Sequence, residues 1–190
     1  DYLREAIKLN DQMIKYFWDD ENFGFYFTPS DGEKLLVKQK EIYDGAVPSG
    51  NSVAMMNLLK LSRITADTKY ETFSGELATA FSATLNSSPI SHTMFMSGLD
   101  FAVGPSYEIV IVGKKDAPDT KKMISTLRGK YIPNKVVILK VENSVDIEEI
   151  APYTKAQKEI DGSATTYVCL NFVCKLPTTD PQKMLELLEN

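Results

Sequence analysis

The first hundred residues of the chain carry apolar side chains mostly at the three- and four-residue spacing of a helix. This pattern predicts four helices, at residues 3–18, 50–65, 68–85 and 91–102. Between the first two, the segments 23–27 and 34–38 flank a turn rich in Pro, Asp and Gly, and we expect both to be extended. The first part of the chain is thus predicted to consist of α-hairpins with one small β excursion.

The pattern changes at Gly104-Pro105, after which short runs of β-branched residues appear. Strands are predicted at 108–113, 135–141 and 165–169, and helices at 119–130 and 181–189. The first two strands and the helix between them predict a βαβ unit with a right-handed crossover. Asp180 is the expected cap of the last helix, which Pro181 opens, and residues 143–163 are expected to be irregular or partly helical.

These elements predict an α+β protein. We expect a helical segment over residues 1–104 and a small α/β domain, containing the βαβ unit, over residues 105–190. The N-terminus lacks an initiator Met and the basic and apolar stretches of a signal peptide. We therefore expect further sequence to precede this chain in a larger protein.

Composition and charge narrow the possible partners. The 190 residues are 43% hydrophobic and 25% charged, as in an ordinary folded protein. A net charge of −5 argues against a nucleic-acid partner, which would require a basic surface. No apolar run approaches the roughly 20 residues that cross a bilayer, so no membrane partner is expected. Two cysteines do not form a disulfide scaffold, which favours a reducing compartment, and we expect a cytoplasmic protein.

A polar loop before the second helix contains the first candidate site. Asp44, Ser49 and Asn51 lie in this Gly-flanked loop, and Tyr43 and other aromatic residues that could stack on a sugar lie nearby. A carboxylate at such a helix end can serve as a general acid or base, which makes Asp44 the candidate catalytic residue, with Ser49 and Asn51 as hydrogen-bonding positions for the ligand. The alternative is structural: Asp44 would stabilise the turn while Ser49 or Asn51 caps the helix.

His92 is the single histidine, which argues against a His-rich metal site, and we expect no metal and no cofactor. It either lines the same cavity as Asp44 or takes part in a helix start. The loop after the first strand, Gly113-Lys114-Lys115, lies where open α/β sheets bind ligands. It lacks the glycine-rich and Walker motifs of nucleotide sites, so we interpret it as a solvated turn.

Cys169 and Cys174 are the second candidate site, a possible thiol pair. On a straight strand their Cα atoms would lie roughly 16 Å apart, at about 3.3 Å per residue. A disulfide requires about 7 Å or less, so the two bond only if residues 170–173 form a turn, with which Asn171 is compatible. We favour two buried, unreactive thiols, and thiol redox chemistry remains the alternative.

Several segments together resemble a known family. In order, they are Asp44-Gly45-Ala46-Val47-Pro48-Ser49-Gly50-Asn51, Leu99-Asp100-Phe101-Ala102, Gly104-Pro105, Glu108–Gly113, Tyr131-Ile132-Pro133-Asn134 and Thr166–Pro181. In this order and spacing they resemble the C-terminal part of the thioredoxin-domain-containing proteins of the bacterial YyaL type. The animal relatives of these proteins are the spermatogenesis-associated thioredoxin-like proteins.

The resemblance implies an N-terminal thioredoxin-like domain, then an α/α toroid similar to six-hairpin glycosidases, then a C-terminal α/β region. This chain would hold the last hairpins of the toroid and the α/β region, with the upstream domains as its partners. The first hypothesis is that it contributes to a toroid cavity for a sugar or another small polar ligand. The alternative is a non-catalytic interaction module that docks on the thioredoxin-like domain or another partner. The likeness to sugar enzymes is an analogy of fold.

Overall fold

The computed structural model describes residues 2–141 and 145–189. The chain divides into two compact units. The helical unit contains the residues up to Ser62 together with Asp67–Val103, and the α/β unit contains Arg63–Ala66 and the residues from Gly104 onward. Two residues of the predicted irregular segment, 143 and 144, lie outside the described residues.

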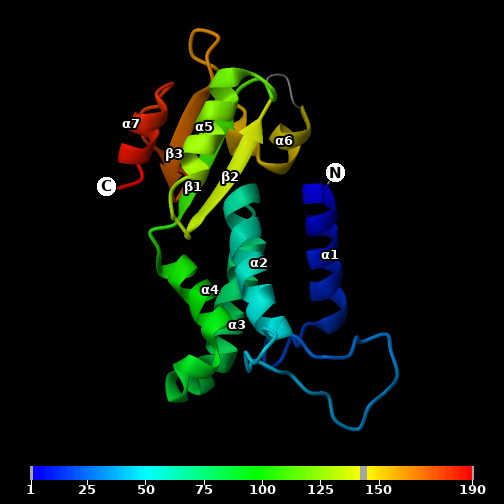
Figure 1. The fold of residues 1–190 in the computed structure, drawn as a ribbon. Coiled ribbons are helices and arrows are strands. Elements are labelled where there is room, and N and C mark those ends of the chain that lie inside the picture. Colours follow the sequence, from blue (N-terminus) through cyan, green and yellow to red (C-terminus); the bar gives the residue numbers. More distant parts are fainter. Residues whose placement is uncertain (1, 142–144, 190) are drawn as a thin grey trace. The chain divides into compact units, whose positions relative to one another are not determined.

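Four α-helices appear in the first part of the chain, as predicted (Figure 1). They are α1 (Tyr2–Phe17), α2 (Gly50–Thr65), α3 (Thr68–Ser87) and α4 (Thr93–Val103), with the short 3₁₀ helix η1 (Pro89–Ser91) before α4. The core of the helical unit includes Leu58, Leu77 and Phe95, all fully buried. Helices α2 and α4 pack closely, because a Cβ at Gly98 would lie only 2.8 Å from Cγ of Met55.

The prediction of two extended segments between α1 and α2 is wrong. Residues 23–27 form one isolated bridge, between Phe25 and Trp18, and residues 34–38 form no ladder strand. Leu36 and Val37 are exposed, so they offer no apolar face on which a strand could be stabilised. The aromatic residues pack instead around Trp18, whose ring lies 4.9 Å from that of Phe25 and 4.9 Å from that of Phe73.

The α/β unit is built on a four-stranded sheet with the order β2-β1-β3-β4. Its strands are β1 (Tyr107–Val112), β2 (Lys135–Lys140), β3 (Thr165–Leu170) and β4 (Val173–Cys174). The βαβ unit is confirmed, since β1 and β2 are parallel and α5 (Pro118–Arg128) lies between them in sequence. Strand β3 pairs with β1 in the antiparallel direction, which makes the sheet mixed. Strand β4 was not predicted.

Alternating residues of the fully buried strand β1 supply two apolar layers. Ile109 and Ile111 pack with side chains of α5 and of α7 (Pro181–Glu186). Val110 and Val112 pack on the other face with Ile138 and Ala151, beside α6 (Val145–Ile150) and the 3₁₀ helix η2 (Pro152–Thr154). The predicted cap of α7 is confirmed: the carboxylate of Asp180 accepts bonds from the N–H groups of Gln182 and Lys183.

The expectation of two free, buried thiols is wrong. Cys169 and Cys174 form a disulfide, with their Cα atoms 3.8 Å apart. Asn171 and Phe172 both have positive φ angles, of 52° and 62°, and form the tight turn that reverses the chain from β3 into β4. This turn places the two cysteines directly opposite each other in the ladder. Asn-Phe lacks the glycine of a strong hairpin signal, which is why the sequence pattern did not reveal the turn.

Candidate functional site

The carboxylate of Asp44 is bound by backbone N–H groups from two segments. Its Oδ1 accepts from Ser49 at 2.9 Å, and its Oδ2 accepts from Met94 at 2.8 Å and Phe95 at 3.2 Å. The last two N–H groups belong to the first turn of α4 and have no partner within the helix. Burial acts to raise the pKa of Asp44, but these bonds and one from Ser52 hold it below its ordinary value. The bond from Ser49 matches the structural alternative, in which Asp44 stabilises the turn, while the bonds from Met94 and Phe95 join the loop to α4 and were not predicted.

Ser49 and Asn51 fix the start of α2. The hydroxyl of Ser49 accepts a 3.1 Å bond from the N–H of Ser52, as an N-cap does. The Asn51 amide binds backbone groups of two distant residues. Its Oδ1 accepts from the N–H of Phe25 at 2.7 Å, and its Nδ2 donates to the carbonyls of Phe25 and Glu41. Both side chains therefore have structural partners, and both are buried.

Tyr43 and His92 flank the same corner but differ in exposure. The side chain of Tyr43 is 59% exposed, whereas that of His92 is 4% exposed. Nδ1 of His92 lies 2.7 Å from the carbonyl oxygen of Ser88, and because a carbonyl only accepts, Nδ1 is the donor. The backbone N–H of Asp44 donates to the carbonyl of Ser91, so the Asp44 loop and the start of α4 do come together. The contacts of His92 match a role in this helix start.

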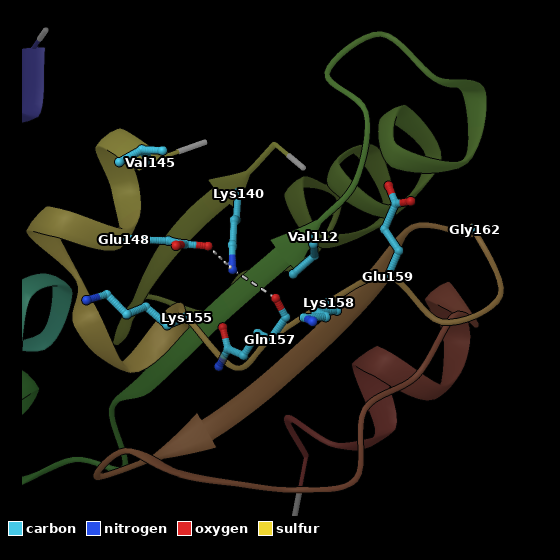
Figure 2. A pocket seen from close by; sticks show the side chains of 9 residues that line it. All are labelled: Val112, Lys140, Val145, Glu148, Lys155, Gln157, Lys158, Glu159 and Gly162. Atoms are coloured by element: carbon cyan, nitrogen blue, oxygen red, sulfur yellow. Dashed lines mark hydrogen bonds and ion pairs between the residues drawn. The ribbon is translucent and has the colours of Figure 1, made fainter. Parts of the chain in front are cut away.

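A pocket of about 460 Å³ lies in the α/β unit, at the carboxyl ends of the parallel strands β1 and β2 (Figure 2). Val112 and Lys140, the last residues of these strands, are paired in the ladder and both line the pocket. Ligands of open α/β sheets bind at this edge. Sequence reasoning missed Lys140, although a lysine that ends a strand of buried type was a signal for a buried cation.

Lys140 is only 3% exposed, and its ammonium group has three oxygen partners. It lies 2.8 Å from Oε1 of Glu148, and it donates to the carbonyls of Thr154 at 2.7 Å and Gln157 at 2.9 Å. Figure 2 shows the ammonium between the Glu148 carboxylate and the Gln157 carbonyl. A buried cation is retained where its charge is balanced in this way. Lys140 thus joins β2, α6 and the segment after η2.

Gln157 has unused hydrogen-bonding capacity in the pocket lining. Its side chain is 5% exposed, and its Oε1 has no hydrogen-bond partner among the described residues. A buried amide oxygen without a partner costs stability. Around it, the exposed cations Lys155 and Lys158 and the half-buried carboxylate of Glu159 complete a polar wall. The pocket therefore offers both positive charge and hydrogen-bond acceptors.

A second buried ion pair lies within the α/β unit. Glu108 of β1 is fully buried, and its carboxylate is 3.1 Å from Nη1 of Arg63 and accepts a 3.0 Å bond from the N–H of Phe172. Burial raises the pKa of Glu108 above its ordinary value, against the opposing effects of Phe172 and Arg63. The same Nη1 donates to Oδ1 of Asn171 at 2.7 Å. This pair ties the turn after β3 to the sheet.

Residues 2–141 and 145–189 contain neither a cluster of metal ligands nor a membrane-spanning helix. Within these ranges no three His, Cys, Asp or Glu side chains form a group that could hold a metal ion. No helix there is both long and apolar enough to cross a membrane.

Comparison with known proteins relates the chain to part of longer proteins. It is similar to the human protein named Spermatogenesis-associated protein 20, with 33% identity over 98% of this chain, and to its rat counterpart, with 32% identity. It is also 27% identical to a protein of Caenorhabditis elegans over 98% of this chain. The chain spans about a quarter of the length of these relatives. No family model matches it.

Proposed function

We propose that this chain is the C-terminal region of a larger protein in the family of Spermatogenesis-associated protein 20. The similarity over nearly the whole chain, but over only about a quarter of the relatives, supports this assignment. In this proposal the helical unit supplies the last hairpins of an α/α toroid. A thioredoxin-like domain precedes it, and the whole protein is cytoplasmic.

Within that protein, the α/β unit binds a small polar ligand in the pocket beside Lys140, here called the Lys140 pocket. The observation that carries the proposal is the polar pocket at the carboxyl edge of β1 and β2, whose wall includes the buried Gln157 with an unpartnered Oε1. The same lining brings cations and carboxylates together at the edge where open α/β sheets bind ligands. The site is therefore suited to a ligand rather than to a solvated surface.

The charges of the pocket indicate which ligands fit. Lys155 and Lys158 can bind an acidic group, while Glu148 and Glu159 can accept bonds from hydroxyls. A sugar that carries a phosphate or carboxylate has both kinds of group. We therefore infer an acidic carbohydrate, such as a sugar phosphate or sugar acid, as the ligand class.

Calorimetric titration tests this proposal with glucose 6-phosphate and glucuronate as probes and glucose as the uncharged comparison. The acidic probes should bind, and Gln157→Ala should weaken binding at least fivefold. Lys158→Ala should weaken the acidic probes more than it weakens glucose. Lys122→Ala, an exposed change in α5, is the matched control and should leave affinity unchanged. Equal affinities for all four proteins would exclude the Lys140 pocket.

The second proposed role is the interaction module. The helical unit exposes several large apolar side chains, among them Leu36, Val47 and Ile90, at 105%, 77% and 85%. Such exposure is typical of surfaces that other segments cover. Upstream domains of the same protein are the proposed occupants. Hydrogen exchange should slow at residues 34–48 when the upstream domains are present, and unchanged exchange would contradict the proposal.

We also propose that Asp44 is the general acid or base of the toroid cavity, where Tyr43 and His92 contact the ligand. It requires the full-length protein, because the upstream hairpins would complete the cavity. Asp44→Asn there should abolish turnover of the sugar substrate. If folded Asp44→Asn protein turns over the substrate at the wild-type rate, Asp44 is not catalytic and only caps α4.

A further inference from the structure

The two cysteines of the disulfide differ sharply in exposure. Cys169 is fully buried, whereas Cys174 and its neighbour Val173 are exposed. Strand β4 has only these two residues, and it pairs with β3 alone in the sheet. An external thiolate can therefore approach Cys174 more readily than the buried Cys169. Access to one sulfur is what thiol exchange requires.

The exposed cysteine also contacts a residue that lines the Lys140 pocket. Nε2 of Gln157 donates to Sγ of Cys174 at 3.7 Å, and Gln157 lines the pocket. The backbone carbonyl of the same residue accepts the 2.9 Å bond from Lys140. One buried residue thus joins the disulfide to the central cation of the pocket.

The turn between the two cysteines has anchors besides the disulfide. Asn171 accepts a bond from Arg63, and Phe172 donates its N–H to Glu108. The ring of Phe172 packs edge-on against that of Tyr153, at 5.2 Å between centroids. These contacts do not involve sulfur, so they hold the turn when the disulfide is broken. The two thiols then stay close enough to bond again, which makes the change reversible.

We propose that Cys174 is the exchange site of a reversible disulfide. Reduction frees the Cys174 side chain to rotate away from Gln157, and loss of this contact weakens ligand binding in the Lys140 pocket. The second part rests on the ligand-binding function proposed above. The first part depends only on the disulfide and on the exposure of its two cysteines.

The reductant is a dithiol. One of its thiolates attacks Sγ of Cys174, a mixed disulfide forms, the Cys169–Cys174 bond breaks, and Cys169 leaves as a thiolate. The second thiolate of the dithiol then attacks the dithiol sulfur that is bonded to Cys174. The mixed disulfide breaks, and Cys174 leaves as a thiolate. The dithiol ends as a disulfide and supplies two electrons and two protons, and both cysteines end as thiols.

Labelling of the reduced chain tests the exchange site. After reduction with dithiothreitol, a brief pulse of maleimide should modify Cys174 at least tenfold faster than Cys169, as peptide mass spectrometry reports. Reoxidation with oxidised dithiothreitol should restore the disulfide in folded protein. Equal labelling of the two cysteines, or faster labelling of Cys169, would overturn the assignment, as would failure to reoxidise.

Hydrogen exchange of the same samples, without ligand, tests the link to the pocket. Reduction should speed exchange at residues 155–160 at least threefold and leave α5 unchanged. The affinity for glucose 6-phosphate should fall at least fivefold on reduction, and Gln157→Ala should abolish this dependence while the exposed control Gln182→Ala retains it. Unchanged exchange at 155–160 would overturn the link. If exchange responds and no probe binds in either state, the ligand proposal fails and the exchange site stands.

Discussion

The three backbone N–H groups bound by Asp44 lie on residues that are five, fifty and fifty-one positions away from it. A capping side chain is usually a neighbour in sequence, next to the helix it caps. Here the first turn of α4 is capped from a distant loop. The interaction therefore stabilises tertiary structure as well as the helix end.

Asp44→Ala should lower the free energy of unfolding by about 1–2 kcal/mol, the usual value for a lost cap. The lowered pKa of Asp44 means that its contribution is present above the ordinary pKa of 3.8 and is lost as pH falls through the lower folded-state pKa. Urea unfolding at pH 7 and pH 3 should show a smaller difference between variant and wild type at pH 3. Asp31→Asn, in an exposed turn, is the control and should leave the free energy of unfolding unchanged at both pH values.

Lys140 carries a positive charge, opposite to that of Asp44, and is more deeply buried than Asp44. Lys140→Met should cost about 3 kcal/mol of stability, because it leaves the Glu148 carboxylate and two carbonyls without their donor. Glu148→Gln should cost less, because Glu148 is 29% exposed and water can replace part of its interaction. Urea unfolding monitored in the α/β unit measures both. A Lys140→Met protein as stable as wild type would contradict the balanced-charge interpretation.

At the scale of elements, helix packing in the helical unit depends on one close approach. Gly98 lies in the middle of α4, against Met55 of α2, while Gly75 lies in the middle of α3 with no atom within 4 Å of the position of its Cβ. Glycine lowers helix stability by about 1 kcal/mol relative to alanine. Substitution of Gly75 therefore measures intrinsic helix preference alone, whereas substitution of Gly98 measures helix preference together with packing.

Gly75→Ala should stabilise the protein by roughly 0.5–1 kcal/mol, since the added methyl meets no atom. Gly98→Ala should destabilise it by about 1–2 kcal/mol, because the methyl pushes Met55 away and the gain in helix preference does not offset this strain. Thermal unfolding of the two variants compares them directly. Stabilisation by both changes would show that α2 and α4 separate easily.

At the scale of the whole molecule, helix α2 belongs to both units. Its residues up to Ser62 lie in the helical unit, and Arg63 to Thr65 lie in the α/β unit. Arg63 pairs there with the buried Glu108, and Ile64 packs against the apolar layer of Val110 and Val112. The last turn of a single helix is thus part of the second core.

Arg63→Ala should lower stability by about 3 kcal/mol, because it leaves the Glu108 charge buried without its partner. The pKa of Glu108 is already above the ordinary 4.5, so the contribution of Glu108 to stability is greatest below this value and falls as pH rises through the folded-state pKa. Without Arg63 this fall should extend to higher pH, and urea unfolding should show a larger deficit at pH 8 than at pH 5. Lys60→Ala, an exposed change in α2, serves as the control.

The sequence pattern predicted the helices, the βαβ unit and the Asp180 cap because local spacing and capping residues determine them. It failed where contacts distant in sequence decide the outcome. The partners of Asp44 in α4 and of Gln157 at Cys174 are not visible in any local pattern. Residues 34–38 have strand-forming composition, yet no neighbouring strand takes up their hydrogen bonds. Strand β4 depends on two non-glycine residues with positive φ, which sequence preference disfavours.

The bond from Asp44 to the start of α4 also offers a route to fragment complementation. If the chain is cut between α3 and η1, Asp44 lies on one fragment and its two α4 partners lie on the other. The cap then becomes an intermolecular contact. Loss of the carboxylate would appear as weaker association of the two fragments, by roughly 5- to 30-fold for about 1–2 kcal/mol. A stability effect within one chain would thus become a binding constant between two.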